Sequence, residues 1–267
     1  ALSALFVFGS SAAFFLMCND VRCDTMLTGA VITAIWLGCA LLEQGRWWQS
    51  VGMGLALAAG MLAKGPIGLV VPAMAIGAQL AFSRKWYRLR DPRWAIALAV
   101  VVLALLPMCI GLYQQHGWHG IHFYFWEQSF GRITGENRWK DDSTVLFFTH
   151  ELLWQLLPWT FLVLFGLWTG AKALLRKEPL PEYASLFGAV LTFVAISLSH
   201  FKLPHYLYVA LPLFAVFAAR AIHETLPRWI RWAQGMFLLL LWGALLVLVW
   251  AVFPEQRWPY AAVAAGM

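Results

Sequence analysis

The feature that most constrains this chain is a succession of long apolar segments separated by short polar connections. The segments run for roughly 16 to 22 residues, the length that an α-helix needs to cross the hydrocarbon core of a bilayer. Charged residues make up only 12% of the 267 residues, about half the share in a soluble domain. Backbone groups in lipid must be hydrogen-bonded within their own segment. The sequence therefore predicts an all-α polytopic membrane protein.

About nine spanning helices are expected from the apolar pattern. They fall near residues 2–17, 26–42, 50–63, 67–83, 94–113, 144–171, 183–199, 206–220 and 233–253. We interpret residues 1–267 as a single transmembrane domain. The chain opens in mid-helix, without Met and without the basic start of a signal peptide. We therefore expect the domain to be partial and the natural protein to begin upstream.

The basic residues predict how the helices are oriented. Most of them lie in connections that fall on one side of the membrane if the helices alternate: Arg46, Arg84, Lys85, Arg88, Arg90, Arg93, Lys172, Arg176, Lys177, Arg220, Arg228 and Arg231. The short turns on the other side contain only Arg22, Lys64 and Lys202. The positive-inside rule makes the first side cytoplasmic. The net charge of +6 is thus topogenic, and its dispersal gives no stripe for nucleic acid.

The connection over residues 114–143 is the longest and is predicted to lie outside, in the periplasm. Its part from 121 to 133 has aromatic residues on one side and polar residues on the other. That pattern is typical of an interfacial helix lying on the bilayer. We expect residues 135–143 to form a polar loop.

Ionisable residues gather at the predicted outer ends of the helices. The set is Asp20, Arg22, Asp24, Lys64, Glu127, Arg132, His150, Glu151, Lys202 and His205. Such groups near membrane depth are costly and indicate function. A transporter would more often place them near the midplane, at broken helices. An enzyme acting on a lipid headgroup would place them at the interface, as in this chain.

Each residue also has a plain structural interpretation. Arg22 and Asp24 can form a salt bridge that orients a turn, and Lys64 can extend to the lipid phosphates. Glu127 can belong to a solvated helix face. Lys202 and His205 can be ordinary loop residues.

Together, these residues fit a sugar-phosphate diester. Cations would hold the phosphate, and aromatic rings would stack on the sugar and on a polyprenyl chain. The chemistry would be displacement at an anomeric carbon with polyprenyl phosphate leaving. It needs a carboxylate base and cations that neutralise the leaving phosphate. No metal is required if Lys and Arg neutralise it, and the sequence has no strong metal-binding signature.

Several short motifs occur together in one order. They are Val21–Thr28 (VRCDTMLT), Ala63–Gly68 (AKGPIG) with Pro72, Phe125–Gln128 (FWEQ) through Arg132, Leu156–Trp159 (LLPW), and Ser199–Tyr206 (SHFKLPHY) with Pro212. In order and spacing they resemble the bacterial branch of the protein O-mannosyltransferase superfamily, which includes the lipid A aminoarabinose transferases. The resemblance covers most of the chain.

This resemblance implies a GT-C-type transmembrane helix bundle and inverting transfer from an undecaprenyl-phosphate-type donor. The acceptor would be a lipid A-like glycolipid or a protein, on the periplasmic face of the bacterial inner membrane. Lys64, Lys202 and Tyr206 would lie near the lipid phosphate. Arg132 would assist, and Asp24 would face the same cavity. The other predicted site residues are Arg22 and His205 for the donor, and Glu127 and Gln128 in the cavity.

The chain departs from the family pattern in two ways. In the aminoarabinose transferases a His usually follows the interfacial Glu, and here that position is Gln128. We therefore assign no metal ligand and no required cofactor, while a divalent metal near Asp24 stays an alternative. The presumed catalytic carboxylate of the family lies in a loop upstream of residue 1. We expect the fragment alone to be inactive.

Two other classes of function are kept as alternatives. The outer charges would gate the substrate of a transporter or flippase for a lipid-linked or anionic molecule. A non-catalytic membrane assembly subunit would lose no activity when Lys64 or Lys202 is changed. The sequence does not identify the sugar, the acceptor or the oligomeric state, and His150 and Glu151 have no assigned role.

Overall fold

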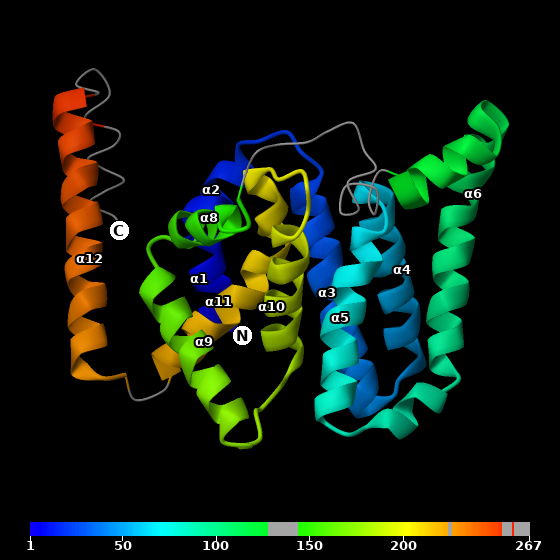
Figure 1. Cartoon of the computed structure of the whole chain (residues 1–267), viewed down its shortest axis with the longest axis horizontal. Helices are drawn as coiled ribbons and strands as arrows, with labels where there is room; N and C mark the ends of the chain where they lie inside the picture. Colours follow the sequence, from blue (N-terminus) through cyan, green and yellow to red (C-terminus); the bar gives the residue numbers. More distant parts are fainter. Residues whose placement is uncertain (128–143, 224–225, 253–257, 259–267) are drawn as a thin grey trace.

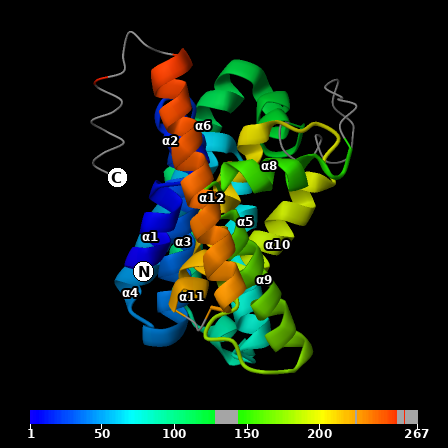
Figure 2. The same cartoon turned by 90° about the vertical axis from the view of Figure 1, so that its left-hand side faces the viewer.

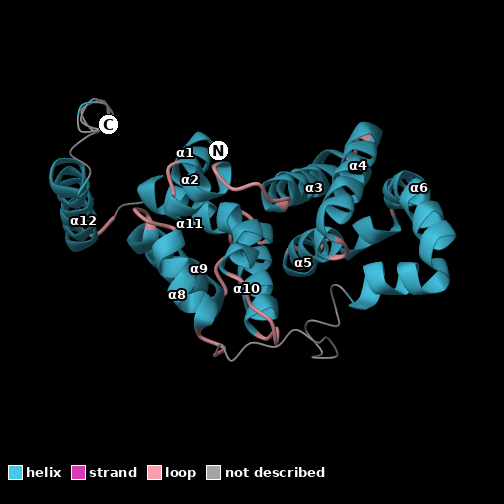
Figure 3. Cartoon of the chain, turned by 90° about the horizontal axis from the view of Figure 1, so that it is seen from above, coloured by secondary structure: helices cyan, strands magenta, loops and turns pink. Residues whose placement is uncertain are grey.

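The computed structural model describes residues 1–127, 144–223, 226–252 and 258. Within these ranges the chain consists of helices, turns and short loops, without a strand (Figures 1 and 3). The elements in chain order are α1 (Leu2–Gly9), α2 (Ala12–Cys18), α3 (Asp24–Gln44), α4 (Trp47–Lys64), α5 (Ile67–Phe82), η1 (Trp86–Arg90), α6 (Arg93–His122), η2 (Phe123–Glu127), α8 (Phe147–Gln155), α9 (Thr160–Leu175), α10 (Ala184–Ser197), η3 (Pro204–Ala210), α11 (Leu211–His223), α12 (Arg228–Val247) and η4 (Leu248–Val252). The predicted all-α class is confirmed.

The buried side chains form two hydrophobic clusters. One, the α11 cluster, gathers residues of α1, α2 and α8 to α11 around Leu211, Phe214 and Phe217. The other, the α4 cluster, gathers residues of α4 and α6 around Met53 and Met61. Helices α3 and α5 contribute to both clusters and lie between the two groups of helices (Figure 1). A site formed across α3 and η3 therefore joins both groups.

Helices α4 and α5 pack with their backbones in close contact, as the Gly- and Ala-rich sequence of 50–63 predicts. A Cβ atom on Gly68 would collide with the backbone of Gly60 and Met61. On the other face of α4, a Cβ atom on Gly54 would lie 2.6 Å from the carbonyl oxygen of Ala97 in α6. Small residues permit such close approach in membrane bundles. The Gly60–Gly68 contact fixes the hairpin whose turn carries Lys64.

The predicted helix over 2–17 is wrong as a continuous span, because it is divided into α1 and α2. The Ser10 hydroxyl donates to the Phe6 carbonyl at 2.6 Å. The Ser11 hydroxyl accepts the N–H of Phe14 at 3.3 Å and so caps α2. Serine side chains compete with the backbone for hydrogen bonds in this way. The apolar pattern runs through both serines and does not reveal the break.

The predicted helix over 144–171 is also wrong as one continuous helix. The helix direction changes by 118° between α8 and α9. Pro158 lies at the bend, where it has no N–H to donate and would clash with the carbonyl of Trp154 in a continuous helix. The hydroxyl of Thr160 donates to the Leu153 carbonyl at 2.6 Å, which satisfies an acceptor at the end of α8. Proline chemistry here overrides the apolar pattern.

Four helical stretches of the described residues are long and apolar enough to cross a membrane. They are Asp24–Gln44, Arg93–Glu127, Pro204–His223 and Arg228–Val252. The bent pair α8 and α9 would be a fifth, and α5 and α10 are shorter apolar helices. These features support a multi-pass membrane protein, and the count of about nine spans stays a prediction.

The connections gather at two ends of the bundle. The loops before α3, between α4 and α5, and before η3 lie at the upper end in Figure 1, here called the Asp24 end. The turns at 45–46, 83–92 and 176–183 lie at the opposite end, here called the Arg90 end. The cationic segment 84–93 is thus separated from Lys64 and Arg22 by the length of the helices, as predicted.

Helix α6 continues beyond 113, where the predicted span ended, as far as His122. Gly117 interrupts it with a φ of 60°, and the helical segment that follows turns across the Asp24 end (Figure 1). The predicted interfacial helix, 121–133, is described as far as Glu127. Its remainder lies outside the described residues, and the periplasmic position of 114–143 stays a prediction.

Helix α12 runs along the outside of the bundle (Figure 2). Only Ile230 and Gln234 of this helix are buried. The Gln234 side chain donates to the carbonyl of Pro158 at 2.8 Å and so connects α12 to the bend between α8 and α9. The exposed apolar surface of the rest of α12 suits contact with lipid.

Candidate functional site

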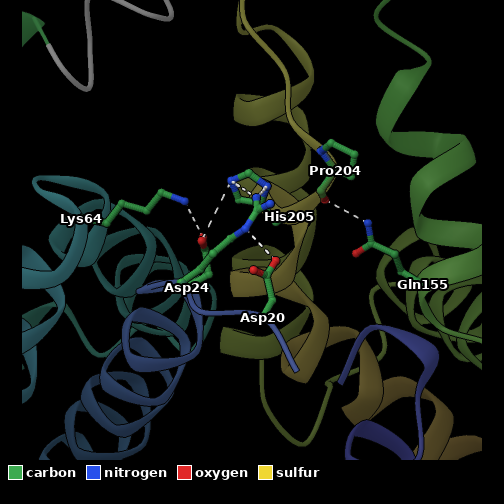
Figure 4. Close-up of polar contacts among 7 residues, drawn as sticks. Asp20, Asp24, Lys64, Gln155, Pro204 and His205 are labelled. Atoms are coloured by element: carbon green, nitrogen blue, oxygen red, sulfur yellow. Dashed lines mark hydrogen bonds and ion pairs between the residues drawn. The ribbon is translucent and has the colours of Figure 1, made fainter. Parts of the chain in front are cut away.

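Five of the predicted site residues come together at the Asp24 end. They are Arg22, Asp24, Lys64, His205 and Tyr206, here called the Asp24 cluster. They come from the turn before α3, the first residue of α3, the last residue of α4 and the first turn of η3. Figure 4 shows Lys64 and His205 pointing toward Asp24 from different elements.

Asp24 is the buried centre of the cluster, and its side chain is only 5% exposed. It is the first residue of α3 and lies in the acidic first turn of that helix. The positive end of the helix dipole stabilises a carboxylate there. One carboxylate oxygen forms an ion pair with the Lys64 ammonium, and the other lies 4.0 Å from His205 Nε2. A buried charge is thus paired, as burial requires.

Lys64 is positioned by the turn that follows it. It ends α4, and Gly65 then takes a φ of 77°, a conformation that favours glycine. Pro66 follows, and α5 begins at Ile67. The Lys64 ammonium lies 4.6 Å from the centre of the Tyr206 ring, in a cation–π contact. Its side chain is 23% exposed, so a ligand at the surface can reach the charge.

His205 links the turn before α3 to η3. A ring nitrogen of His205 accepts a hydrogen bond from the guanidinium of Arg22, which can only donate. The ring packs edge-on against Tyr206, with ring centres 4.9 Å apart. Arg22 also pairs with Asp20 at 2.6 Å. The structural interpretation that pairs Arg22 with Asp24 is therefore wrong about the partner, since Asp24 pairs with Lys64. The sequence separation of Arg22 and His205 shows that tertiary packing forms this contact.

Lys202 and Ser199 are buried in the loop between α10 and η3. The Ser199 hydroxyl donates to the carbonyl of Phe201 at 3.0 Å and accepts its N–H at 3.4 Å, which closes the loop on itself. Pro204 begins η3 directly before His205. The loop thus places Lys202 close in sequence to the Asp24 cluster, and its predicted role at the lipid phosphate stays a prediction.

The remaining predicted site residues are only partly described. Arg132 and Gln128 lie outside the described residues. Glu127 Oε1 lies 3.0 Å from His122 Nδ1, and both residues belong to the segment that follows Gly117. In the same region the hydroxyl of Tyr124 donates to the carbonyl of Met61, which attaches this segment to the end of α4. The predicted place of Glu127 in the cavity stays a prediction.

The sequence did not assign a role to Glu151 and did not single out Gln155, and both are buried in α8. Gln155 Nε2 donates to Glu151 Oε2 at 2.8 Å. It also donates to the carbonyl of Pro204 at 2.9 Å, the contact drawn in Figure 4. Trp154 Nε1 donates to the same carboxylate oxygen at 2.9 Å. A Glu and a Gln four residues apart in an apolar helix lie on one face, and this spacing is the signal that could have identified the pair.

The arrangement suits an anionic ligand. Among the described residues, Arg22 and Lys64 contact the carboxylates of Asp20 and Asp24, and Lys202 is a third cation in the loop before η3. A phosphate that reached Lys64 would compete with Asp24 for its ammonium. Asp24 and Lys64 would stay close to each other, so their ion pair would form again when the phosphate leaves.

The part of the chain that the structure describes contains no set of side chains arranged as metal ligands. No three His, Cys, Asp or Glu side chains there come together in a way that could hold an ion. Asp24 instead has a Lys and a His beside it. The alternative of a divalent metal near Asp24 remains untested.

Known proteins match this chain in sequence. The family model described as dolichyl-phosphate-mannose-protein mannosyltransferase matches residues 1–110, which include Asp24 and Lys64. The undecaprenyl phosphate-alpha-4-amino-4-deoxy-L-arabinose arabinosyl transferase of Edwardsiella ictaluri is 27% identical over 197 residues, which are 73% of this chain and 34% of that protein. The transferase of the same name from Aeromonas hydrophila is 27% identical over 288 residues, which are 98% of this chain and 49% of that protein. The chain thus spans about a third to a half of the length of these relatives.

Solved structures match the fold. ArnT from Cupriavidus metallidurans bound to undecaprenyl phosphate superimposes with a TM-score of 0.76 at 18% identity, covering 92% of this chain and 45% of that one. The same protein in the apo state gives a TM-score of 0.72 with the same coverage. At this identity the likeness establishes the fold, and it confirms the predicted GT-C-type helix bundle.

Proposed function

We propose that the chain forms part of a membrane glycosyltransferase. The proposal is supported by the match to the dolichyl-phosphate-mannose-protein mannosyltransferase family model, by the similarity to the aminoarabinose transferases and by the GT-C-type membrane fold. The donor is a sugar linked to polyprenyl phosphate, and the acceptor is a lipid A-like glycolipid or a protein. One observation carries the proposal. The Asp24 cluster presents the Lys64 cation on an aromatic ring at a helix end, where a lipid headgroup would lie.

The reaction forms one bond and breaks another at the anomeric carbon. The acceptor oxygen attacks that carbon from the face opposite the phosphate, and its proton passes to a carboxylate. The bond from the anomeric carbon to the phosphate oxygen breaks, and polyprenyl phosphate leaves with the bonding electrons. The configuration at the carbon is therefore inverted.

The cations of the site act on the leaving phosphate. Negative charge grows on its oxygens as the bond breaks, and Lys64 and Lys202 would neutralise that charge. Arg22 would add a third cation at the entrance, held by Asp20 and His205. The ring of Tyr206 would keep the Lys64 ammonium in place when Asp24 gives up its contact. Asp24 has a supporting role, because it holds Lys64 in the absence of donor.

We place this chemistry on the periplasmic face of a bacterial inner membrane. The cationic segment 84–93 at the Arg90 end supports a cytoplasmic position for that end, under the positive-inside rule. The Asp24 end would then face the periplasm. The names of the related transferases include an undecaprenyl-phosphate-linked sugar, which supports a polyprenyl-phosphate sugar as the donor.

Sugar transfer tests the proposal directly. The complete protein that carries this chain would be incubated with a defined undecaprenyl-phosphate sugar, and wild type would be compared with Lys202→Ala. We expect turnover by the wild type and loss of most of it in the variant. No transfer from any of several donors by a folded wild-type protein would reject the proposal. It would favour a transporter or flippase that uses the same charges as a gate.

A further inference from the structure

The buried pair formed by Glu151 and Gln155 lies beside the Asp24 cluster and outside it. Both side chains belong to α8, and both are less than 10% exposed. A carboxylate in an apolar helix is costly unless it is hydrogen-bonded. Leu or Met would fill the same space without that cost. The pair therefore requires an explanation beyond packing.

The hydrogen bonds fix the orientation of the Gln155 amide. A carboxylate and a carbonyl can only accept, and the Gln155 nitrogen is the only part of that amide that donates. It lies 2.8 Å from Glu151 Oε2 and 2.9 Å from the Pro204 carbonyl oxygen. Its two hydrogens thus serve two acceptors. Glu151 prevents the amide from flipping, and the flipped amide would place an oxygen against the Pro204 carbonyl.

The acceptor in this contact belongs to residues 202–206, here called the site loop. Pro204 lies two residues after Lys202 and directly before His205, and Figure 4 shows Gln155 reaching it from α8. His205 faces Arg22 and Asp24, and Tyr206 faces Lys64. A shift of the Pro204 carbonyl would therefore move three predicted donor-binding side chains together.

We propose that Glu151 and Gln155 are positioning residues that hold residues 202–206 in place for the donor phosphate. Glu151 orients the Gln155 amide, and Gln155 holds the Pro204 carbonyl. Neither side chain touches the donor. This inference rests on the proposed function, because it assigns Lys202, His205 and Tyr206 to the donor phosphate.

The test compares two buried glutamines that each donate to a proline carbonyl. Gln155→Met removes the bond to Pro204, and Gln234→Met removes the 2.8 Å bond to Pro158, which is not in the site loop. Both changes keep side-chain length and lose one carbonyl contact, and Gln155→Met also removes the bond to Glu151 that orients the amide. In the complete protein we expect Gln155→Met to raise the KM for the undecaprenyl-phosphate sugar about 3- to 10-fold, the effect of one hydrogen bond. The KM for the acceptor should not change, and Gln234→Met should match the wild type in both.

A swap of the two residues separates positioning from packing. The double variant Glu151→Gln with Gln155→Glu keeps the same atoms in nearly the same volume. It places a carboxylate against the Pro204 carbonyl, where an acceptor meets an acceptor. We expect the swap to impair donor use as much as Gln155→Met does. Wild-type donor KM in the swapped protein would contradict the proposal.

Amide hydrogen exchange gives a readout that does not depend on turnover. We expect residues 200–206 to exchange at least 3-fold faster in Gln155→Met than in wild type or Gln234→Met.

If the wild type transfers sugar but both Met variants behave alike, the positioning role is overturned while the proposed function stands. If the wild type transfers no sugar, the proposed function fails, and with it the donor role of the loop. Unchanged exchange in Gln155→Met would overturn the holding contact itself.

Discussion

The two ends of the bundle carry charges in different ways. At the Asp24 end, contacts join residues that are far apart in sequence, such as Asp24 with Lys64 and Arg22 with His205. At the Arg90 end, pairs are local. Asp91 pairs with Arg93 at 3.2 Å, and Arg176 lies 3.9 Å from Glu178 with both side chains more than half exposed. The charged pairs of Asp24 thus join distant segments, and these two pairs at the Arg90 end join residues two positions apart.

The difference separates orientation from function. Exposed local pairs contribute little to stability and place few limits on geometry. They suffice to set the sidedness of a membrane protein, which depends on basic residues near the helix ends. A buried pair between distant segments fixes the relative position of several elements. The pair of Asp24 and Lys64 thus helps to fix how α3 and α4 meet at the Asp24 end.

The largest effect is expected from Lys64→Met. The change removes the cation that faces the leaving phosphate and leaves the Asp24 carboxylate buried without its ammonium. We expect sugar transfer to fall by about 100-fold or more, as for the loss of one charge-stabilising donor in other active sites. The control is Arg176→Met at the Arg90 end, which should keep wild-type transfer. Equal loss in both variants would remove the distinction between the ends.

A companion variant separates stability from activity. Lys64→Met should also lower the unfolding free energy in detergent by about 1–3 kcal/mol, because an unpaired charge stays buried. Adding Asp24→Asn removes that charge, and we expect most of the stability to return while transfer stays lost. Recovery of transfer in the double variant would show that Lys64 acts only through Asp24.

The second effect concerns the α4–α5 contact that positions Lys64. Gly68→Ala places a methyl group against the backbone of Gly60, and we expect a loss of about 1–3 kcal/mol in unfolding free energy. The matched control is Gly77→Ala in the same helix, where a Cβ atom meets nothing within 4 Å. That change should be neutral or stabilising. A neutral Gly68→Ala would mean that the two helices are not packed this closely.

A smaller effect is expected from Arg22→Gln. Arg22 is exposed and contacts the site through Asp20 and His205. We expect the donor KM to rise about 3-fold, since screened exposed charges contribute weakly, with the effect shrinking as salt is added. The control Arg90→Gln should leave the donor KM unchanged at every salt concentration. A larger loss than in Lys64→Met would reverse the order of importance within the cluster.

The smallest effect is expected from Glu178→Gln. It breaks the exposed pair with Arg176 at the Arg90 end. We expect a change in unfolding free energy of no more than about 0.5 kcal/mol. Thermal unfolding at low and high salt measures it. A loss of unfolding free energy well above that value would show that this local pair stabilises the fold.

Sequence patterns predicted the helical class and the separation of the two ends, because apolar length and basic residues determine both. They did not predict the breaks at Ser10 and Pro158. Hydropathy continues through both positions, and hydrogen bonds of single residues decide them. A break within an apolar block therefore requires the local chemistry of Ser or Pro to be weighed above the apolar average.

The site was predicted as a set of residues without its internal pairing. Charged residues at helix ends identified Asp24, Lys64 and His205, since charge near a membrane is costly wherever it lies. Their partners depend on how α3, α4 and η3 pack, which no spacing in the sequence encodes. Gln155 was missed because an uncharged amide in an apolar helix gives a weak signal. Its importance follows from the Pro204 carbonyl that it meets.

The central claim is that the Asp24 cluster binds the phosphate of a polyprenyl-phosphate donor. The most direct test is the affinity of the complete protein for undecaprenyl phosphate, measured for wild type, Lys64→Met and Arg176→Met in the same detergent. We expect Lys64→Met to bind undecaprenyl phosphate at least 10-fold more weakly than wild type, and Arg176→Met to bind it as wild type does. Equal affinity in all three proteins would contradict it and place the phosphate elsewhere.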